Sequence, residues 1–492
     1  MTGTDAGTAT GTSGRMLIDG TWRGAADGRT LPVEAPGERR VIGDIPRGGA
    51  ADVDLAVKAA AAAFPSWRRT TPTERAALLR EVAARLAARH EEFARAVAVE
   101  TGNAIRTQAR GEIALSVEAL YYFAGVAGEL KGETIPLGEN TLSYTRREPL
   151  GVVGAIIPWN GPVGIAALKL GPALAAGNTV VLKAAEDASL CVLLLAEIFN
   201  DVFPPGVVNV VTGLGEEAGA ALAEHPGVNK LTFTGSTEVG KIIGVAAARR
   251  VVPVSLELGG KSPFILFPDV DLDVAADAVM TAMRFTRQAQ SCTAGSRLFL
   301  HRDVYDEFLT RLAGKVEQYT IGNPLDEASD IGALINRKQF DRVCGYIRDG
   351  LAQPGVQVLT GGLPPTEGPL AEGYFTQPTI LGGADNTWRL AQEEIFGPVL
   401  VAIPWSDEDE VVAMANDSHY GLAGYVWSND IRKALRTAHR VESGWVQVNR
   451  AGGQSLGQPY GGFKQSGLGK EYDLSGMLDS FTQVKAITVD LG

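Results

Sequence analysis

The sequence predicts an α/β protein built from two open, mostly parallel sheets, and two observations support this prediction. From about residue 151 to residue 258, short apolar runs alternate with helical stretches, and the alternation returns after residue 292. Such alternation is typical of parallel sheets that helices cover on both faces. Because the chain has 492 residues, it exceeds one ordinary hydrophobic core, and about three domains are expected.

The N-terminal part of the chain is predicted to form a tail, then a few short strands and then helices. Residues 1–15 are rich in Thr, Gly and Ala and are expected to be disordered. Short strands and turns are expected over 16–45, and helices from Ala50 onward. Thr71-Pro72-Thr73-Glu74 has the capping-box spacing, with Pro at the first helical position. A second long helix is predicted over about 91–130.

Five apolar runs of the first α/β region are predicted as strands: 151–157, 179–183, 207–211, 230–234 and 254–258. Helices are expected between them, from about Ser189 and over 215–224. After residue 292 the pattern predicts a strand near Leu298, a helix from Val304, and strands near residues 379 and 399. Ligands of such sheets bind at the carboxyl ends of the strands.

Two segments with polar and apolar residues in alternation, 141–147 and 481–489, are predicted as exposed strands. A lone terminal strand must pair with another strand. The two segments are therefore expected to form a small sheet that meets another subunit.

Composition excludes several classes of partner. With 45% apolar and 21% charged residues the chain is expected to be soluble and globular. A formal charge of −12, from 45 basic and 57 acidic residues, argues against nucleic acid and gives no basic patch for a membrane surface. The uncharged run 149–168 is long enough to span a membrane, but the helix-breaking Pro158-Trp159-Asn160-Gly161-Pro162 lies at its centre. Three cysteines, an odd number, suggest a reducing compartment, the cytoplasm.

Of the three cysteines, Cys292 is the candidate nucleophile. Cys191 and Cys344 lie in apolar helical runs, where a thiol usually packs as a small hydrophobic group. Cys292 lies among small polar residues and Gly, where its side chain can stay accessible. A nucleophilic thiol needs that access, and it needs a nearby group that favours the thiolate.

Two polar residues at predicted strand ends could assist such a nucleophile. Glu257 ends an apolar strand, where burial of a carboxylate is costly, and this position suits a general base with a raised pKa. Asn160 lies in a proline-flanked turn after the first strand, and a fixed amide can donate to a developing oxyanion. A solvated strand end and a structural turn asparagine are the alternatives.

Three further features could bind a nucleotide. Gly235 to Gly240 follows a strand and opens a helix, which points backbone N–H groups toward a phosphate, although a simple turn would look the same. Lys183 and Glu186 follow the end of another strand, where a carboxylate can accept both ribose hydroxyls. A surface ion pair is the alternative there. Glu394-Ile395-Phe396 places a carboxylate and an aromatic ring two residues apart in a turn, where Phe396 could equally be a core residue.

Seven motifs occur in one order along the chain. They are Pro-Trp-Asn (158–160), Leu-Lys-x-x-Glu (182–186), Phe-Thr-Gly-Ser (233–236), Glu-Leu-Gly-Gly-Lys (257–261), Gln-x-Cys (290–292), Glu-Ile-Phe-Gly-Pro (394–398) and Gly-Gly-Phe-Lys-x-Ser-Gly (461–467). Any one could arise by chance, but all seven in order are specific. From about residue 16 to its end, the chain resembles the NAD(P)-dependent aldehyde dehydrogenases of the hydrolytic, non-acylating type.

The resemblance implies a role for each matched catalytic position. Cys292 would attack the aldehyde carbonyl, and Asn160 with the backbone N–H of Cys292 would hold the oxyanion. Glu257 would activate the water that hydrolyses the thioester. Lys169 and Glu471 match the family's proton-relay positions.

The resemblance also implies a nucleotide site. Lys183 and Glu186 would hold the adenosine ribose and Glu394 the nicotinamide ribose, with Phe396 beside the nicotinamide. NAD is expected rather than NADP because Glu186 would repel a 2′-phosphate. The other residues implied to contact the cofactor are Ile156, Pro158, Trp159, Gly215, Gly219, Phe233, Gly235, Ser236, Gly240, Leu258, Gly259 and Gln339.

By the same resemblance, residues 16–131 and 151–258 would form a Rossmann-like NAD-binding domain and 259–457 a second, catalytic one. Segments 132–150 and 472–492 would supply oligomerisation strands, which implies a homodimer or homotetramer. No metal site is predicted.

The chain departs from the family pattern at three positions: Ala184 stands where Pro is usual, Ala289 where Gly is usual, and Gly161 where many members have an aromatic ring. Without that ring the pocket is expected to be wide enough for a bulky aldehyde. Ser291 and Thr293 would also line the pocket. Arg287 and Arg450 map to its mouth, where either could clamp a distal carboxylate or instead point to solvent or pair with an acid.

Three other functions remain open. A CoA-acylating aldehyde dehydrogenase is disfavoured by Glu257, because that class generally lacks a deacylating base there. A non-catalytic binding protein on the same fold is disfavoured by the retention of Cys292, Glu257 and Asn160 together. A phosphate- or semialdehyde-reducing relative would share a cysteine and a nucleotide fold, but not these seven motifs.

Overall fold

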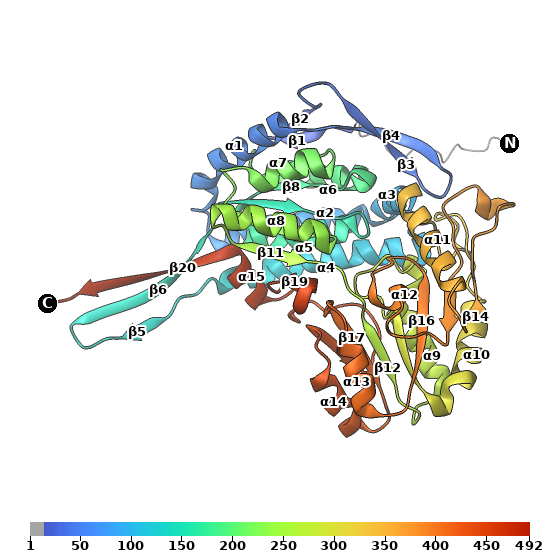
Figure 1. The fold of residues 1–492 in the computed structure, drawn as a ribbon. Coiled ribbons are helices and arrows are strands. Elements are labelled where there is room, and N and C mark those ends of the chain that lie inside the picture. Colours follow the sequence, from blue (N-terminus) through green and yellow to red (C-terminus); the bar gives the residue numbers. More distant parts are fainter. Residues whose placement is uncertain (1–13) are drawn as a thin grey trace.

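The computed structural model describes residues 14–492, so most of the predicted disordered tail lies outside the described residues. The larger sheet has eight strands (Figure 1). Their order is β19 (Gly467–Leu468), β11 (Val254–Glu257), β10 (Lys230–Thr234), β7 (Val152–Ile156), β8 (Thr179–Lys183), β9 (Val208–Val211), β1 (Met16–Ile18) and β2 (Thr21–Arg23). The five strands from β11 to β9 run parallel, and β19, β1 and β2 are antiparallel to their neighbours.

The strand order reverses direction between β7 and β10. The chain builds β7, β8 and β9 outward on one side, and it then returns to add β10 and β11 on the other. In an open parallel sheet, such a switch point leaves a crevice at the carboxyl ends of the strands, where ligands bind. The predicted turn with Asn160 and the predicted Gly235–Gly240 turn follow these two central strands.

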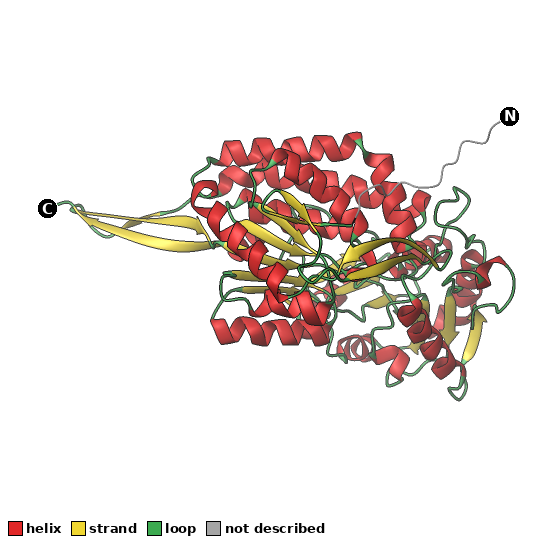
Figure 2. Cartoon of the chain, turned by 90° about the horizontal axis from the view of Figure 1, so that it is seen from above, coloured by secondary structure: helices red, strands yellow, loops and turns green. Residues whose placement is uncertain are grey.

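Helices cover both faces of this sheet (Figures 1 and 2). They are α1 (Ala50–Trp67), α2 (Pro72–Ala88), α3 (His90–Thr101), α4 (Arg110–Val126), α5 (Pro162–Ala175), α6 (Leu190–Val202), α7 (Ala220–Glu224) and α8 (Thr237–Arg250). The side chains of strand β8 point alternately to the two faces of the sheet. Val180 and Leu182 pack with α2, α5 and α6, whereas Val181 packs with α1, α7 and α8. This two-residue alternation follows from the pleat of a strand.

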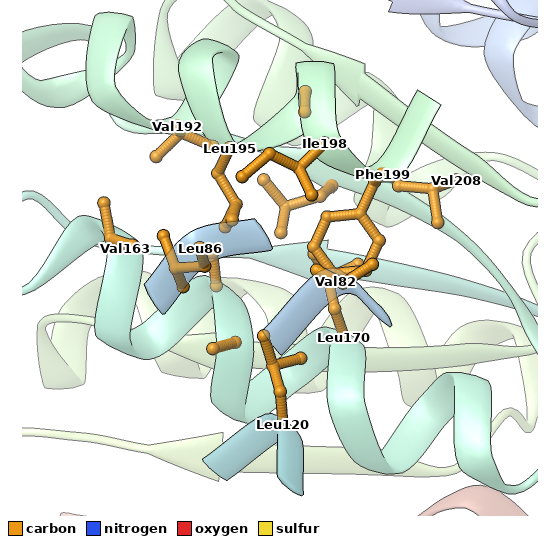
Figure 3. Close-up of a cluster of buried hydrophobic side chains, with 14 of the residues drawn as sticks. Val82, Leu86, Leu120, Val163, Leu170, Val192, Leu195, Ile198, Phe199 and Val208 are labelled. Carbon is orange, nitrogen blue, oxygen red and sulfur yellow. The ribbon is translucent and has the colours of Figure 1, made fainter. Parts of the chain in front are cut away.

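The larger apolar cluster lies between the sheet and the layered helices α2, α4, α5 and α6 (Figure 3). Val82 and Leu86 of α2 face Leu195 and Phe199 of α6 within it. All four side chains are fully or almost fully buried. This packing makes α5 a rigid element, and α5 carries Lys169 of the predicted site.

The prediction of one long helix over 91–130 was wrong. Helix α3 ends at Thr101, and a π-helical segment, η1 (Ile105–Ala109), precedes α4. The break comes at Gly102, whose φ is +77° and where a Cβ would lie 2.4 Å from the carbonyl oxygen of Ala333. Glycine is needed there, and a left-handed residue ends a helix.

The second sheet has seven strands, all parallel except β14. Their order is β14 (Gln357–Thr360), β15 (Thr379–Gly382), β16 (Val399–Trp405), β13 (Arg297–His301), β12 (Pro263–Leu266), β17 (Ala423–Trp427) and β18 (Trp445–Val448). Its helices are α9 (Leu272–Met283), α10 (Tyr305–Val316), α11 (Arg337–Leu351), α12 (Arg389–Gln392), α13 (Glu408–Asn416) and α14 (Ile431–Arg440). The sequence predicted β13, β15 and β16 but not the other four strands.

A small antiparallel sheet of β20 (Thr482–Asp490), β6 (Thr141–Pro149) and β5 (Thr134–Pro136) projects from the body of the molecule (Figure 1). The pairing of β6 with β20 runs from Thr482 opposite Pro149 to Asp490 opposite Thr141, as the two alternating segments predicted. The segment 472–492 is not all strand, however, because helix α15 (Leu474–Phe481) precedes β20. Two sheets of parallel type and this small sheet make up the predicted α/β class.

The remaining elements are short. Strands β3 (Thr30–Ala35) and β4 (Arg40–Pro46) form a hairpin. The short helical turns are η2 (Ala127–Glu129), η3 (Glu186–Ala188), η4 (Gly215–Gly219), η5 (Phe285–Arg287), η6 (Arg302–Val304), η7 (Pro369–Ala371) and η8 (Lys464–Ser466). Within residues 14–492, no helix is both long and apolar enough to cross a membrane. The uncharged run 149–168 instead forms β7, a turn and the start of α5.

The fully buried Asn178 predicts a test of the fold. Its Oδ1 accepts from the N–H groups of Leu150 and Gly151, and its Nδ2 donates to the carbonyls of Ala173 and Phe481. We expect Asn178→Ala to reduce the free energy of unfolding by roughly 2–4 kcal/mol, because buried backbone groups would lose their partners. Urea unfolding followed by tryptophan fluorescence measures this effect. Asn140→Ala, at an exposed position, is the matched control, and equal stability of the two variants would contradict the prediction.

Candidate active site

Asn160 and Cys292 come together although they belong to different sheets. Asn160 follows β7, and its Nδ2 donates a hydrogen bond of 2.9 Å to the backbone carbonyl of Gln290. The Gln290 side chain is buried and accepts from the N–H of Ile335, which fixes the loop in turn. An amide nitrogen carries two hydrogens. The second N–H of Asn160 therefore stays available in the space beside Cys292.

The loop before Cys292 is held in an uncommon backbone conformation. Gln288 and Ala289 both have φ of +51°, in the left-handed region. Ala289, which stands where the family usually has Gly, adopts that conformation despite its Cβ. Gly260 touches the loop from the first sheet, since a Cβ at that position would lie 2.3 Å from the Cys292 carbonyl oxygen.

Cys292 is half-buried, whereas Cys191 and Cys344 are buried. Its Sγ lies 3.5 Å from the hydroxyl of Tyr460, a residue that the sequence analysis did not select. Burial raises the pKa of the Cys292 thiol to about 11, and the Tyr460 hydroxyl opposes this rise. The carboxylates of Glu394 and Glu257 also raise it, which shows that both act on the sulphur. The free protein therefore holds Cys292 mainly as a thiol at neutral pH.

Glu257, the last residue of β11, is buried, and neither of its carboxylate oxygens has a hydrogen-bond partner among residues 14–492. Burial is the main cause that raises its pKa well above the usual value, and the nearby carboxylate of Glu471 adds to it. The positive charges of Lys169 and Lys470 act in the opposite direction. Gly461 closes over this group, since a Cβ there would lie 2.7 Å from Glu257 Oε1. An unpaired buried carboxylate with a raised pKa has the properties of a general base.

Lys169 of α5 and Glu471 form a buried ion pair of 2.6 Å, so the predicted relay positions meet. Glu471 also accepts a hydrogen bond of 3.2 Å from Thr232 on β10. Because the Glu471 charge acts on Glu257, the pair lies within electrostatic reach of the candidate base.

The C-terminal motif Gly461–Gly467 holds the segment that follows Glu257. Strand β19 pairs with β11, with Gly467 opposite Glu257. Ser466 Oγ donates a hydrogen bond of 2.6 Å to the carbonyl of Gly259, and the Ser466 carbonyl accepts from the Leu258 N–H. No role was predicted for this motif from the sequence. Tyr460 directly precedes the motif, and this position is the one feature of the sequence that could have identified Tyr460 as a site residue.

The residues predicted to hold the adenosine end lie at the carboxyl edge of the first sheet. Lys183 Nζ and Glu186 Oε2 are 2.8 Å apart, with Lys183 buried and Glu186 partly exposed. The neighbouring Asp187 has a pKa raised to about 6 by burial, so it is also ionised at pH 7. Ser236 caps α8 by accepting from the Val239 N–H. The N-terminal end of this helix therefore faces the crevice at the switch point.

The glycines predicted to contact the cofactor differ in what surrounds them. Gly235 packs under the Phe233 ring, where a Cβ would lie 2.3 Å away, and Gly240 similarly packs against Leu258 at 2.4 Å. Gly215 and Gly219 lie in η4, where a Cβ would meet no atom within 4 Å. Gly259 is crowded as well, since a Cβ there would lie 2.5 Å from Glu394 Oε2. Gly235, Gly240 and Gly259 therefore exclude a side chain by crowding within the described chain, whereas Gly215 and Gly219 do not.

The residues predicted for the nicotinamide end come from the second sheet. Glu394 Oε1 accepts from the Gly260 N–H at 2.9 Å. Burial raises the pKa of Glu394 to about 7, although this N–H and Lys261 oppose the rise. The Phe396 ring meets the ring of Trp159 edge-to-face, with centroids 5.3 Å apart. The amide of Gln339 donates to the carbonyls of Ile395 and Phe396, so in this structure it shapes that turn.

On the substrate side, Gly161 does not leave the open space that we expected. A Cβ at Gly161 would lie 2.8 Å from Nη2 of Arg287, so the guanidinium occupies the place of the missing side chain. Ser291 and Thr293 join their hydroxyls at 3.1 Å beside Cys292. Arg450 is exposed and has no ion pair or side-chain hydrogen bond in the part of the chain that the structure describes.

A nicotinamide dinucleotide fits these groups. A dinucleotide needs an anion-binding helix end, a carboxylate for each ribose and a flat apolar surface for its rings. The end of α8, Glu186 and Glu394, and the Trp159–Phe396 ring pair supply groups of these kinds. The carboxylates of Glu394 and Glu257 both act electrostatically on the half-buried Cys292. This fold and these groups define a dinucleotide-dependent oxidoreductase.

Comparisons with known proteins agree with this class. The model of the aldehyde dehydrogenase family matches residues 22–487. A hydroxyisobutyraldehyde dehydrogenase of Mycolicibacterium austroafricanum is 44% identical over 488 residues, which cover 99% of this chain and 96% of that protein. The NAD⁺ complex of an aldehyde dehydrogenase from Bacillus cereus superposes with a TM-score of 0.95 at 38% identity, over 98% of each chain. A betaine aldehyde dehydrogenase from Staphylococcus aureus, a point mutant in complex with NAD⁺, gives 0.94 at 34% identity, over 98% of this chain and 96% of that one.

The chain belongs to the aldehyde dehydrogenase family. It is an NAD(P)-dependent oxidoreductase that acts on the aldehyde group. The resemblance on the seven motifs and the predicted fold class are both confirmed.

The raised pKa of Cys292 predicts its reactivity in the free protein. The thiolate is the reactive form. With a pKa of about 11, the rate of alkylation by iodoacetamide should climb about tenfold per pH unit from pH 7 to pH 9.5. Labelling followed by mass spectrometry measures this rate, with Cys292→Ala as the control for reaction at Cys191 and Cys344. A plateau below pH 9 would contradict the prediction. In Tyr460→Phe the same curve should shift to higher pH, since the hydroxyl no longer stabilises the thiolate.

Proposed function

We propose that the protein oxidises an aldehyde to a carboxylic acid through a thioester on Cys292, with NAD as the hydride acceptor and Glu257 as the base that activates water. The observation that carries this proposal is Glu257, a buried carboxylate that has no hydrogen-bond partner among residues 14–492 and acts electrostatically on Cys292. A burial cost of this kind is tolerated where the group performs chemistry.

The first step is the attack of Cys292 Sγ on the carbonyl carbon. A planar aldehyde cannot release hydride directly, so the new C–S bond must first make the carbon tetrahedral. The free N–H of Asn160 and the backbone N–H of Cys292 would hold the oxyanion that forms. A donor in this role typically contributes roughly 3 kcal/mol. The thiol proton leaves to water or to a base as the C–S bond forms, and Glu394 and Glu257 are the two carboxylates that act electrostatically on Cys292.

Loss of hydride from the tetrahedral carbon, for which bound NAD would be the acceptor, would leave Cys292 as a thioester. Glu257 then takes a proton from water as the water oxygen attacks the thioester carbonyl. The C–S bond breaks, the carboxylic acid leaves and the thiol is restored. The Lys169–Glu471 pair lies within reach to pass the proton onward. Because Glu257 must be deprotonated for this step, its raised pKa implies that hydrolysis speeds up with increasing pH.

Glu186 and Asp187 support NAD over NADP. Glu186 follows the carboxyl end of β8, where the adenosine ribose is expected, and a 2′-phosphate there would meet its negative charge. The partly buried Asp187, whose Oδ2 accepts from Asn336, adds a second carboxylate next to it. Lys183 and Glu186 would hold this ribose, and Glu394 would hold the ribose of the nicotinamide. The B. cereus and S. aureus relatives were solved with NAD⁺, which supports the same choice.

Assembly as a homodimer or homotetramer fits the surface of the chain. The small sheet of β5, β6 and β20 projects from the body and carries exposed apolar side chains, among them Leu142 and Val484. Helix α8 exposes Val239, Ile242 and Val245. The three cysteines are free thiols, which suits a reducing compartment such as the cytoplasm.

The test distinguishes the role of Cys292 as the nucleophile from the role of Glu257 as the base. Wild-type protein with NAD and aldehydes, hydroxyisobutyraldehyde among them, should form NADH without CoA. Cys292→Ala should abolish NADH formation. Glu257→Gln should release one equivalent of NADH in a burst and then turn over roughly 10²–10⁴-fold more slowly, because the thioester persists. Stopped-flow absorbance and mass spectrometry of the acyl-enzyme measure both outcomes.

Activity that requires CoA would support the acylating alternative. NAD binding without turnover, with and without CoA, would support the non-catalytic one. Full multiple turnover by Glu257→Gln would contradict the assignment of the base.

A further inference from the structure

Arg287 takes the place of a side chain that the chain lacks at residue 161. Its Nη2 lies 2.8 Å from where a Cβ of Gly161 would stand, and Ile165 Cδ1 is the next nearest group at 3.7 Å. Gly161 directly follows Asn160, the proposed oxyanion donor. A guanidinium therefore stands beside the reacting carbonyl's site, in space that an uncharged side chain could have filled.

The Arg287 guanidinium makes only one, long side-chain hydrogen bond to the described part of the protein. Among residues 14–492 its one ion pair is a long one, from Nη2 to Oε2 of the buried Glu112 at 3.5 Å, and its buried Nε has no hydrogen-bond partner. The other oxygen of Glu112, Oε1, accepts from the N–H groups of Val163 and Gly164 at the start of α5. Arginine offers five donors in a rigid fork, and those on Nη1 make no hydrogen bond among the described residues.

Arg287 faces the same space as the nucleophile. Burial raises the pKa of both Cys292 and Tyr472, and the positive charge of Arg287 opposes each rise. The rings of Tyr472 and Tyr460 stack with centroids 4.7 Å apart, and the Tyr460 hydroxyl is the contact of Cys292 Sγ. About a quarter of the Arg287 side chain is exposed (26%), so it is accessible from this space. The site thus combines the aromatic rings of Tyr460 and Tyr472 with the positive charge of Arg287.

We propose that Arg287 binds a carboxylate at the far end of the substrate, so that the enzyme selects aldehydes that carry a second, anionic group. This inference rests on the dehydrogenase function proposed above. Two parallel N–H groups of a guanidinium match the two oxygens of a carboxylate, and such pairs are the stronger class of hydrogen bond. Without a cation here, the carboxylates of Glu257 and Glu394 would repel an anionic substrate. Arg287 offsets that repulsion at the one position where the backbone leaves room for it.

The experiment compares 5-oxopentanoate with its methyl ester, which has nearly the same shape and no charge. For the wild type, kcat/KM should favour the carboxylate by tenfold or more. Arg287→Met should remove most of this ratio, mainly through KM of the carboxylate. Gly161→Ala keeps the charge but pushes the guanidinium aside, and it should lower the same ratio. Thermal unfolding of each variant verifies the fold, and Gly161→Ala keeps the proposal testable if Arg287→Met is unstable.

Two arginines serve as comparisons. Arg302→Met removes an exposed charge at the far end of β13 from the Cys292 loop, and its ratio should equal that of the wild type. A loss of the ratio in Arg450→Met but not in Arg287→Met would move the clamp to Arg450 and overturn the proposal. Oxidation of pentanal and the ester without any preference for the carboxylate would overturn it while the dehydrogenase function stands. Failure to oxidise any of the three would overturn both.

Discussion

The pairing of β19 with β11 is the constraint on which the site depends. This short antiparallel contact places Gly467 opposite Glu257 and fixes the C-terminal segment against the edge of the first sheet. The same segment carries Tyr460, which touches Cys292, and Glu471, which pairs with Lys169. Ser466 adds a hydrogen bond to the carbonyl of Gly259. Without this pairing, the candidate base would keep its place on β11 but would lose the groups that set its pKa.

Burial sets the chemistry of the site more than any single charge does. It is the largest cause that raises the pKa of Cys292, Glu257 and Glu394. Close approach of glycine backbone produces that burial at two of them, since Gly461 lies over Glu257 and Gly259 lies against Glu394. Burial thus favours the protonated, uncharged form of all three groups. The cost of desolvating them is offset by the packing of two sheets and their helices.

The two sheets supply different parts of one site. The first contributes the oxyanion donor Asn160 and the base Glu257, and the second contributes the loop of Cys292 and the turn of Glu394. Contacts that join these parts include the hydrogen bond from Asn160 to Gln290 and the edge-to-face contact of Trp159 with Phe396. A change in either contact would alter the position of the nucleophile relative to its helpers. Arg287 belongs to the same junction, because it meets Gly161 across it.

The sequence by itself determined the family, the order of the first sheet's strands along the chain and the residue types of the site. Each of these depends on neighbours within a few positions: the apolar runs of β7 and β8, the capping box at Thr71, and motifs such as Gln290-Ser291-Cys292. Local patterns could not show where the helix over 91–130 breaks, because Gly102 is required by its contact with Ala333, far away in the chain.

Only the tertiary structure decided what surrounds the reactive groups. Tyr460 meets Cys292, Gln339 holds the turn at Phe396, and Arg287 fills the space beside Gly161. From the sequence alone, a glycine at residue 161 predicts a wider pocket. The fold, however, brings Arg287 from another loop into that space. Burial, and with it each pKa, is a property of segments that meet only after folding, and no periodicity of the chain encodes it.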